Sequence, residues 1–286
     1  MNLSILDGIL TSLIYLLASF ALFFIGRLIY KLVNKSIDVD HELVEKDNLA
    51  FAFANVGYYI GLLIAIWSLY IGESEGHIID DLIGIFIFGL LSIVLLNLSV
   101  FITDKLILRK FDLRKEIIED QNVGTGVIEG AVCVANGLII HGVMAENPDN
   151  YFGIIALWAL AQVFLFIAVL FYNLITSYNI HDEIEKDNVA AGIGVAGAIV
   201  AIANLVRHGA GLEAESWIQV VENLGLETGI GLLMLPLVRF LTDKILLPGR
   251  KLTDEIVNQE VPNIGAGVIE AFGYVGGSVL ICMSFG

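Results

Sequence analysis

Three long stretches of this sequence contain no charged residue. They cover positions 49–72, 82–103 and 151–180, and none of them holds an Asp, Glu, Lys or Arg. A transmembrane helix needs about 20 predominantly apolar residues to cross roughly 30 Å of hydrocarbon, so each stretch is long enough to span a bilayer. Buried helices of soluble proteins seldom avoid charge over such a length. The sequence therefore predicts an integral membrane protein.

Further apolar segments raise the expected number of spans to about eight. Only 16% of the 286 residues are charged, whereas a soluble domain carries about 25%. We predict an all-α integral membrane fold that contacts the lipid bilayer directly. The expected spans cover roughly 9–31, 49–71, 80–102, 123–144, 152–177, 189–207, 217–238 and 264–284, with the usual uncertainty of a few residues at each end.

The basic residues predict the orientation of these spans. All of the 15 Lys and Arg residues except Arg207 lie at the C-terminal ends of the first, third, fifth and seventh spans or in the segments that follow them. Short loops rich in Lys and Arg stay in the cytoplasm, so we expect a multi-pass protein with both termini outside the cytoplasm. The net charge of −16 leaves no basic patch that could neutralise phosphates, which excludes nucleic acid as a partner.

The chain contains an internal repeat. Positions 41–50 read HELVEKDNLA and align without a gap with HDEIEKDNVA at 181–190. FITDK at 101–105 matches FLTDK at 240–244, and NVGTGVIE at 122–129 matches NIGAGVIE at 263–270. We infer a tandem duplication with its seam near 147–150, and expect one four-helix repeat in 1–145 and a second in 150–286.

A weaker repeat inside each half suggests that the basic unit is a helical hairpin that occurs four times. In the first half, Glu42 precedes Asn48 as Glu116 precedes Asn122. Units with an even number of spans share one orientation, so the copies should be parallel repeats related by an axis along the membrane normal.

These features resemble the bacterial domain-of-unknown-function 350 family (YjfL-like inner-membrane proteins), here as two tandem copies over nearly the whole chain. The resemblance rests on the four-span units, the acidic inner loop ending in Asn, and the phrase Gly-x-Gly-Val-Ile-Glu. It implies a location in the bacterial inner membrane. It implies no activity, because that family has no settled biochemical function.

The loop residues before the even-numbered spans have two interpretations. Asn at the start of a helix can accept a hydrogen bond from an unpaired N–H, or it can bind a ligand directly. The acids upstream can form a solvated face of an amphipathic surface helix, or an acidic ring that concentrates cations. The residues concerned are Asn48, Asn122, Asn188, Asn263, Glu42, Glu116, Asp182 and Glu255.

No metal, cofactor or catalytic site is expected. His41 and His181 stand beside the loop acids, but the spacing of a metal-ligand motif is missing. The sequence has no Walker motif, no His-Glu-x-x-His and no recognisable nucleophile set, so we do not expect an enzyme. Small residues spaced four apart, such as Gly57 and Gly61, favour close packing of the even-numbered spans.

Acidic residues inside the spans are the strongest functional signal. Glu129 and Glu270 each lie seven residues after a capping Asn, which places them about 10 Å into the membrane. Glu222 and Glu227 lie in the seventh span and have no acidic counterpart in the first half. Ionisable groups inside a membrane are rare, costly and usually functional, although a protonated or hydrogen-bonded structural role remains open.

Two functions follow from these features. The first is a gradient-driven or passive channel or transporter for a cation, a proton or a small cationic solute, with the intramembrane acids in a shared polar path. The second is a non-transporting scaffold whose acidic cytoplasmic loops recruit a partner protein involved in envelope stress or membrane maintenance. The sequence leaves open whether the chain forms a homo-oligomer.

Overall fold

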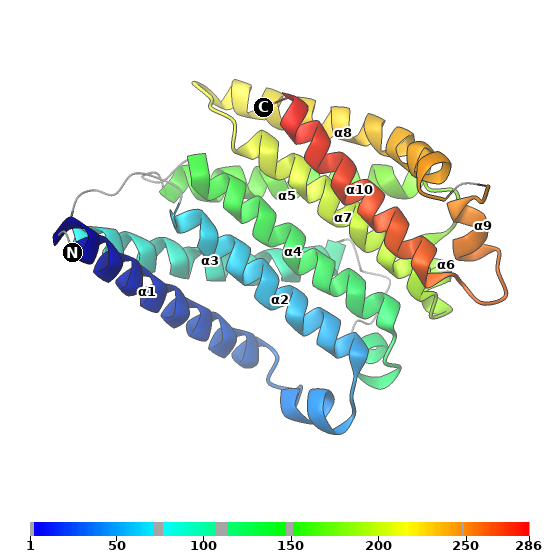
Figure 1. The fold of residues 1–286 in the computed structure, drawn as a ribbon, viewed down its shortest axis with the longest axis horizontal. Helices are drawn as coiled ribbons and strands as arrows, with labels where there is room; N and C mark the ends of the chain where they lie inside the picture. Colours follow the sequence, from blue (N-terminus) through cyan, green and yellow to red (C-terminus); the bar gives the residue numbers. More distant parts are fainter. Residues whose placement is uncertain (1–2, 71–76, 107–113, 147–150, 248, 286) are drawn as a thin grey trace.

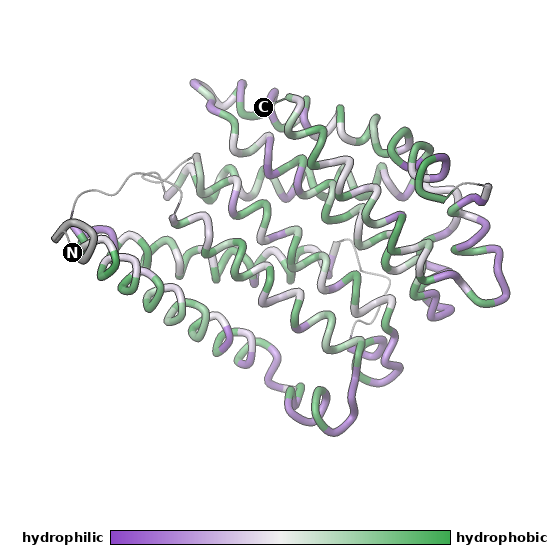
Figure 2. The backbone as a smooth tube through the Cα atoms, viewed as in Figure 1, coloured by the Kyte–Doolittle hydropathy of each residue, from purple (hydrophilic) through white to green (hydrophobic). Residues whose placement is uncertain are grey.

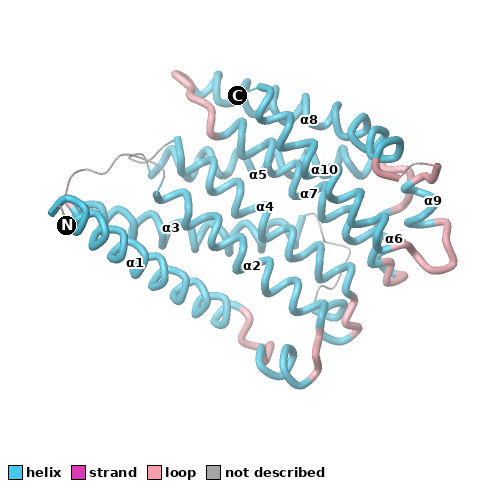
Figure 3. Tube along the Cα trace, in the orientation of Figure 1, coloured by secondary structure: helices cyan, strands magenta, loops and turns pink. Residues whose placement is uncertain are grey.

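The computed structural model describes residues 3–70, 77–106, 114–146, 151–247 and 249–285, and all regular structure in these ranges is helical (Figures 1 and 3). The predicted seam of the duplication at 147–150 lies outside the described residues. The helices are α1 (Leu3–Val33), η1 (His41–Glu45), α2 (Leu49–Trp67), η2 (Ser68–Tyr70), α3 (Ile78–Leu106), η3 (Lys115–Glu119), α4 (Val123–Glu146), α5 (Tyr151–Ile175), α6 (Ile180–Glu185), α7 (Val189–Ala210), α8 (Trp217–Ile245), α9 (Leu252–Val257) and α10 (Ile264–Phe285).

Eight of these helices are long and apolar enough to cross a membrane. They are α1 to α5, α7, α8 and α10, which confirms the predicted number and order of spans. The structure corrects several of the predicted boundaries, and those at the ends of α3 and α8 matter most for the site. Both helices continue beyond the expected ends at 102 and 238, to Leu106 and Ile245. The extended parts include Asp104 of α3 and Arg239 of α8, which contact acidic residues of α4 and α10.

The eight helices form two rows. In the first row α2, α4, α7 and α10 lie side by side in chain order, as Figure 1 shows. All four begin at a short helix, so they run parallel to one another. The second row consists of α1, α3, α5 and α8, which pack against the first row and run in the opposite direction. Each span of the second row and the span that follows it thus form a hairpin.

Glycine explains why the first row packs so closely. A Cβ atom on Gly130 of α4 would lie 2.6 Å from the carbonyl oxygen of Phe53 in α2. A Cβ atom on Gly192 of α7 would lie 2.6 Å from the Cα atom of Gly124 in α4. Helices in a membrane gain no hydrophobic free energy by associating, so contact between backbones replaces it. The predicted tight packing of the even-numbered spans is therefore present, as a row.

The two ends of the row carry larger side chains. Phe272 of α10 is 65% exposed, and Val56 and Leu63 of α2 are each 53% exposed. Lipid tails are as apolar as these side chains, so such surfaces suit direct contact with the bilayer.

The two ends of the bundle differ in character. The short helices η1, η3, α6 and α9 gather at one end, called the loop-helix face here, where Figure 2 shows many hydrophilic residues. Both chain termini lie toward the other end, called the opposite face (Figure 1). Apolar residues dominate the helices between the two faces (Figure 2).

Candidate functional site

Each of the four asparagines at the loop-helix face caps a long helix. Its side-chain oxygen accepts a hydrogen bond from the backbone N–H three residues further on, at 3.0 to 3.2 Å. The bond satisfies one of the N–H groups that a helix leaves unpaired at its start. The pairs are Asn48 with Phe51, Asn122 with Thr125, Asn188 with Ala191, and Asn263 with Ala266.

The amide nitrogen of each asparagine also donates to an acid of the preceding short helix. These bonds measure 2.9 to 3.1 Å and hold the short helix against the start of the span. The acids are Glu42 for Asn48, Glu116 for Asn122, Glu183 for Asn188, and Glu255 for Asn263.

In the third loop the acid is Glu183, and not Asp182, which the sequence alignment places opposite Glu42. The winding of the short helix explains the difference. η1 and η3 are π-helices, and their acids Glu42 and Glu116 lie six residues before the asparagine. α6 is an α-helix, and Glu183 lies five residues before Asn188. A π-turn holds about one residue more than an α-turn, which shifts the register by one position. Asp182 is exposed.

Three of the four asparagines also bind the next hairpin. Asn48 donates to the carbonyl oxygen of Ile117, Asn122 to that of Ile184, and Asn188 to that of Ile256, each at 2.9 Å. Asn263 belongs to the last hairpin and is exposed. The asparagines therefore join successive hairpins in addition to capping helices. This role was not visible in the sequence.

The neighbours of two loop acids hold them as carboxylates. Burial opposes the ionisation of Glu42, but hydrogen bonds from Lys46, at 2.7 Å, and from the capping asparagine outweigh it and lower the pKa of Glu42 below its ordinary value of 4.5. The same balance, with Lys186 at 2.9 Å, lowers the pKa of Glu183. These carboxylates are thus engaged inside their own loops.

The two loop histidines pair with neighbouring acids. Nδ1 of His41 lies 2.7 Å from Glu45, and Nε2 of His181 lies 3.3 Å from Glu185. Within the described residues, His, Cys, Asp and Glu side chains form no group of three or more that could hold a metal ion.

Glu129 lies beside Asp104 in the first half. The two carboxyl groups, on α4 and α3, are within hydrogen-bonding reach of each other. Oε2 of Glu129 and Oδ1 of Asp104 are buried, and the described residues offer neither atom a hydrogen-bond partner. The cation that acts on Asp104 is the exposed Lys105. The first half therefore contains two adjoining carboxyl groups without an ion-pair partner among the described residues.

Glu270 has a different partner in the second half. Nε of Arg239 on α8 lies 2.9 Å from Oε1 of Glu270 on α10, and both side chains are largely buried. The Tyr274 hydroxyl donates to the same oxygen at 3.4 Å. Arg239 also donates to Oγ1 of Thr253 at 3.1 Å, which connects the pair to α9. This carboxylate is neutralised within the protein.

One substitution between the repeats accounts for the difference. The aligned phrases FITDK and FLTDK place Asp243 opposite Asp104 and Arg239 opposite Val100. Valine cannot neutralise a carboxylate, so Glu129 lacks the cation that Glu270 has. In the second half Oδ1 of Asp243 accepts the N–H of Leu252 at 2.8 Å. The duplicated carboxyls have thus acquired different environments.

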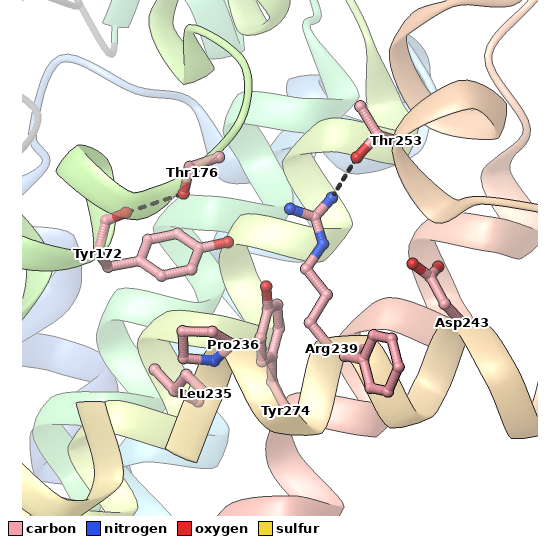
Figure 4. A pocket seen from close by; sticks show the side chains of 9 residues that line it. Tyr172, Thr176, Leu235, Pro236, Arg239, Asp243, Thr253 and Tyr274 are labelled. Carbon is pink, nitrogen blue, oxygen red and sulfur yellow. Dashed lines mark hydrogen bonds between the residues drawn. The ribbon is translucent and has the colours of Figure 1, made fainter. Parts of the chain in front are cut away.

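A cavity of about 270 Å³ opens beside the Arg239–Glu270 pair (Figure 4). Pro236 lies in its wall within α8 and has no backbone N–H, so it leaves a gap in the hydrogen bonding of that helix. Arg239 lines the cavity but already binds Glu270 and Thr253. The lining residues are Tyr172, Thr176, Leu235, Pro236, Arg239, Phe240, Asp243, Thr253 and Tyr274.

The four predicted intramembrane acids do not form one cluster. α7 lies between α4 and α10, the helices that carry Glu129 and Glu270. Glu227 is buried and pairs with Nδ1 of His208 at 3.2 Å. Glu222 is exposed on α8. Glu227 precedes Arg239 by twelve residues on α8, or about 18 Å along the helix axis.

The partners of Glu129 and Glu270 were missed because they were placed in loops. The predicted spans ended at 102 and 238, just before Asp104 and Arg239. The repeated phrase at 101–105 and 240–244 served only as evidence of duplication. Helices that continue through this phrase place Asp104 and Arg239 at the ends of the spans, beside the intramembrane acids.

Comparisons with known proteins agree with the duplication. The family model described as Domain of Unknown Function (DUF350) matches residues 4–144 and again residues 148–285. A transmembrane protein of Aquifex aeolicus (strain VF5), named UPF0719, is 29% identical over 199 residues, which cover 68% of this chain and 71% of that protein. No solved structure matches the chain. The chain is a polytopic membrane protein that belongs to the DUF350 family, with two tandem copies of its domain.

Proposed function

We propose that the protein moves protons or other small cations across the bacterial inner membrane, with Glu129 and Asp104 as the exchanging site. The observation that carries this proposal is the pair of adjoining carboxyl groups without a cationic partner among the described residues. Two carboxyls can hydrogen-bond to each other only when one of them holds a proton, or they can share a bound cation. Either case makes the pair a site for a mobile positive charge.

The contrast with the second half supports this assignment. A charge at the centre of a membrane helix costs about 2.5 to 3.5 kcal/mol unless something compensates it. Arg239 compensates Glu270 permanently, because a guanidinium keeps its proton. Among the described residues Glu129 has no such fixed partner, so a mobile cation can fill that role. The first half would carry the exchange and the second half would hold its carboxylate in place.

Polar side chains continue from the carboxyl pair between the helices of the first half. Tyr30 and Asn55 contact each other beside Glu129. Further from the loop-helix face, Asn97 donates to the Tyr58 hydroxyl at 3.0 Å. These groups extend a route for a proton toward the middle of the membrane.

A second polar group lies near the opposite face. The Ser19 and Tyr70 hydroxyls are 2.7 Å apart, and Tyr15 donates to Asp81. Along α1 and α2, Leu22 and Leu62 separate this group from Tyr58, and both leucines are fully buried. The route is therefore closed by an apolar segment, as expected for a protein that must not leak.

The loop acids offer less support for a scaffold. A partner protein would need accessible carboxylates. Glu42 is 4% exposed and bound by its own lysine and asparagine, so a scaffold role would rest on exposed loop acids such as Glu119 and Asp182 instead. We further propose that the loop-helix face lies in the cytoplasm, because nearly all Lys and Arg residues lie toward it. No ATPase motif is present in the sequence, so an ion gradient would drive the movement.

The test is proton flux into proteoliposomes that contain a pH-sensitive dye, driven by a potassium diffusion potential. We expect flux with the native chain and its loss in Glu129→Gln and in Asp104→Asn. Both changes remove a charge and keep the size of the side chain. Glu119→Gln alters an exposed acid of the neighbouring loop and should leave flux unchanged. The same vesicles are then tested with sodium and potassium gradients.

Two results would contradict the proposal. One is the absence of proton, sodium or potassium flux with folded native chain. The other is unchanged flux in a folded double variant of Glu129→Gln and Asp104→Asn, with folding judged by circular dichroism and gel filtration.

A further inference from the structure

The repeat brings four dissimilar residues to one level near the opposite face. Each lies nineteen residues after the capping asparagine of its helix: Trp67 in α2, His141 in α4, Arg207 in α7 and Cys282 in α10. Since the four helices are parallel neighbours, these residues share a height of about 28 Å from the caps. That height corresponds to the far boundary of the hydrocarbon, where lipid headgroups begin.

Arg207 is a cation that pairs with no anion in the described part of the chain. Its Nε donates to Oδ1 of Asn204 at 2.9 Å, a neutral partner. The nearby acid Glu227 pairs instead with His208. Of the described carboxylates, none forms an ion pair with Arg207, and the side chain is only half-buried.

His141 stands next to this cation and its imidazole is buried. The residue is 7% exposed, and in the described part of the chain neither Nδ1 nor Nε2 finds a hydrogen-bond partner. Its ring lies against Trp67, with centroids 4.7 Å apart. Arg207 packs on Gly142, the next residue of α4, and its charge acts on His141. Buried polar groups in proteins almost always have hydrogen-bond partners, so we expect a ligand to bond to this imidazole.

The side chains of Arg207 and His141 are suited to bind an oxyanion. Guanidinium groups have a planar fork of N–H donors that fits phosphate, and a neutral imidazole adds one further N–H. We propose that Arg207 and His141 bind a phosphate group at the opposite face, supplied either by the headgroup of an anionic phospholipid or by free phosphate. Trp67 is 61% exposed at the same level, where indole rings favour the membrane boundary.

This site is independent of the proposed cation exchange. Asp104 and Glu129 lie toward the loop-helix face, about 10 Å from the caps in the case of Glu129. Binding at Arg207 can therefore fail while flux through the carboxyl pair remains, and the reverse also holds.

The experiment is a titration of the purified full chain in a neutral detergent, followed by native mass spectrometry. The probes are phosphatidylglycerol, phosphatidylcholine as the uncharged lipid, and inorganic phosphate. We expect saturable binding of phosphatidylglycerol or of phosphate, weakened about tenfold or more in Arg207→Gln, since a hydrogen bond to a charged group is lost. Arg250→Gln removes the same charge from an exposed position of the loop-helix face and should bind as the native chain does.

His141→Phe provides a second variant, because it keeps a ring against Trp67 and removes both nitrogens. It should also weaken binding, by a smaller factor. Competition by inorganic phosphate would identify the free ion as the ligand, whereas binding of phosphatidylglycerol without such competition would identify the lipid. The proposal is overturned if Arg207→Gln binds as tightly as the native chain. It is also overturned if neither phosphatidylglycerol nor phosphate binds saturably.

Discussion

The guanidinium of Arg239 and the carboxylate of Glu270 form an ion pair, with 2.9 Å between Nε and Oε1, and they join α8 to α10 inside the second half. The first half carries Val100 where the second carries Arg239. The same duplicated carboxyl is therefore fixed by an arginine in one half, whereas in the other half no described residue forms an ion pair with it. This asymmetry makes the two acids separable by mutation.

Replacing Arg239 with valine should destabilise the protein by about 3 kcal/mol or more, because it leaves Glu270 charged and buried without a partner. The double variant Arg239→Val with Glu270→Gln should recover part of that loss, since both charges are then gone. The free energy of unfolding, measured in mixed detergent micelles, checks both values. Equal stability of the native chain and Arg239→Val would show that the ion pair contributes nothing.

The capping asparagines should differ in their contributions. Asn122→Ala should cost about 2 to 3 kcal/mol, because it removes the cap, the bond to Glu116 and the bond to Ile184 of the next hairpin. Asn263→Ala should cost about 1 kcal/mol, since Asn263 is exposed and its described bonds, to Glu255 and Ala266, stay within its own hairpin. Unfolding free energies of the two variants test the ranking, and the reverse order would contradict a joining role for Asn122.

Close approach of the first-row helices should make Gly130 intolerant of even one methyl group. In Gly130→Ala the new Cβ would meet the Phe53 carbonyl oxygen at 2.6 Å, so a loss of about 1 to 3 kcal/mol is expected. Gly84→Ala is the matched control, because a Cβ atom there meets no atom within 4 Å. That change should be neutral or stabilise by up to about 1 kcal/mol, as alanine favours helix. Similar effects of both changes would argue against steric packing.

Acid should weaken the first loop through Glu42. Its pKa is lowered in the folded protein, so its contribution is present above its ordinary value of 4.5 and is lost as the pH falls below it toward the lowered pKa. The unfolding free energy of the native chain should therefore decline more steeply over this range than that of Glu42→Gln. Glu45→Gln, which changes a side chain that is 71% exposed, serves as the control and should follow the native curve.

Labelling from outside the cell tests the proposed orientation. In a chain with Cys133 and Cys282 replaced by alanine, a single cysteine at Glu213 should react with a membrane-impermeant maleimide. A single cysteine at Glu119, which is exposed on the loop-helix face, should not. Labelling at position 119 in intact cells would reverse the assignment of the cytoplasmic side.

The sequence predicts the spans well because hydrocarbon tolerates so few charges. α7 begins at Val189 as expected, directly after the capping Asn188, and its end differs from the prediction by three residues. Cap chemistry is equally local, since an Asn before an apolar run needs only its own backbone to form the bond. Both predictions depend on neighbours in sequence.

The site depended on contacts between helices and was predicted only in part. Glu129 and Glu270 could be recognised from their depth, but Asp104 and Arg239 approach them from other helices that extend past their apolar cores. A charged residue near a helix end can fold back into a buried contact, and hydropathy alone treats it as the start of a loop. Whether Asp182 or Glu183 bonds to Asn188 likewise depends on whether the short helix is wound as a π-helix or as an α-helix, which the aligned sequences do not reveal.

The hydrogen bonds that the asparagines form between successive hairpins also have a direction. In every one the donor asparagine precedes its acceptor in the chain, from Asn48 to Ile117 through to Asn188 and Ile256. During synthesis each hairpin would leave the translocon after the one that carries its donor. The chain can therefore grow vectorially in the membrane, each newly inserted pair of spans finding an amide already in position. Lateral assembly of this kind would leave each amide without its acceptor for only as long as the next hairpin takes to arrive.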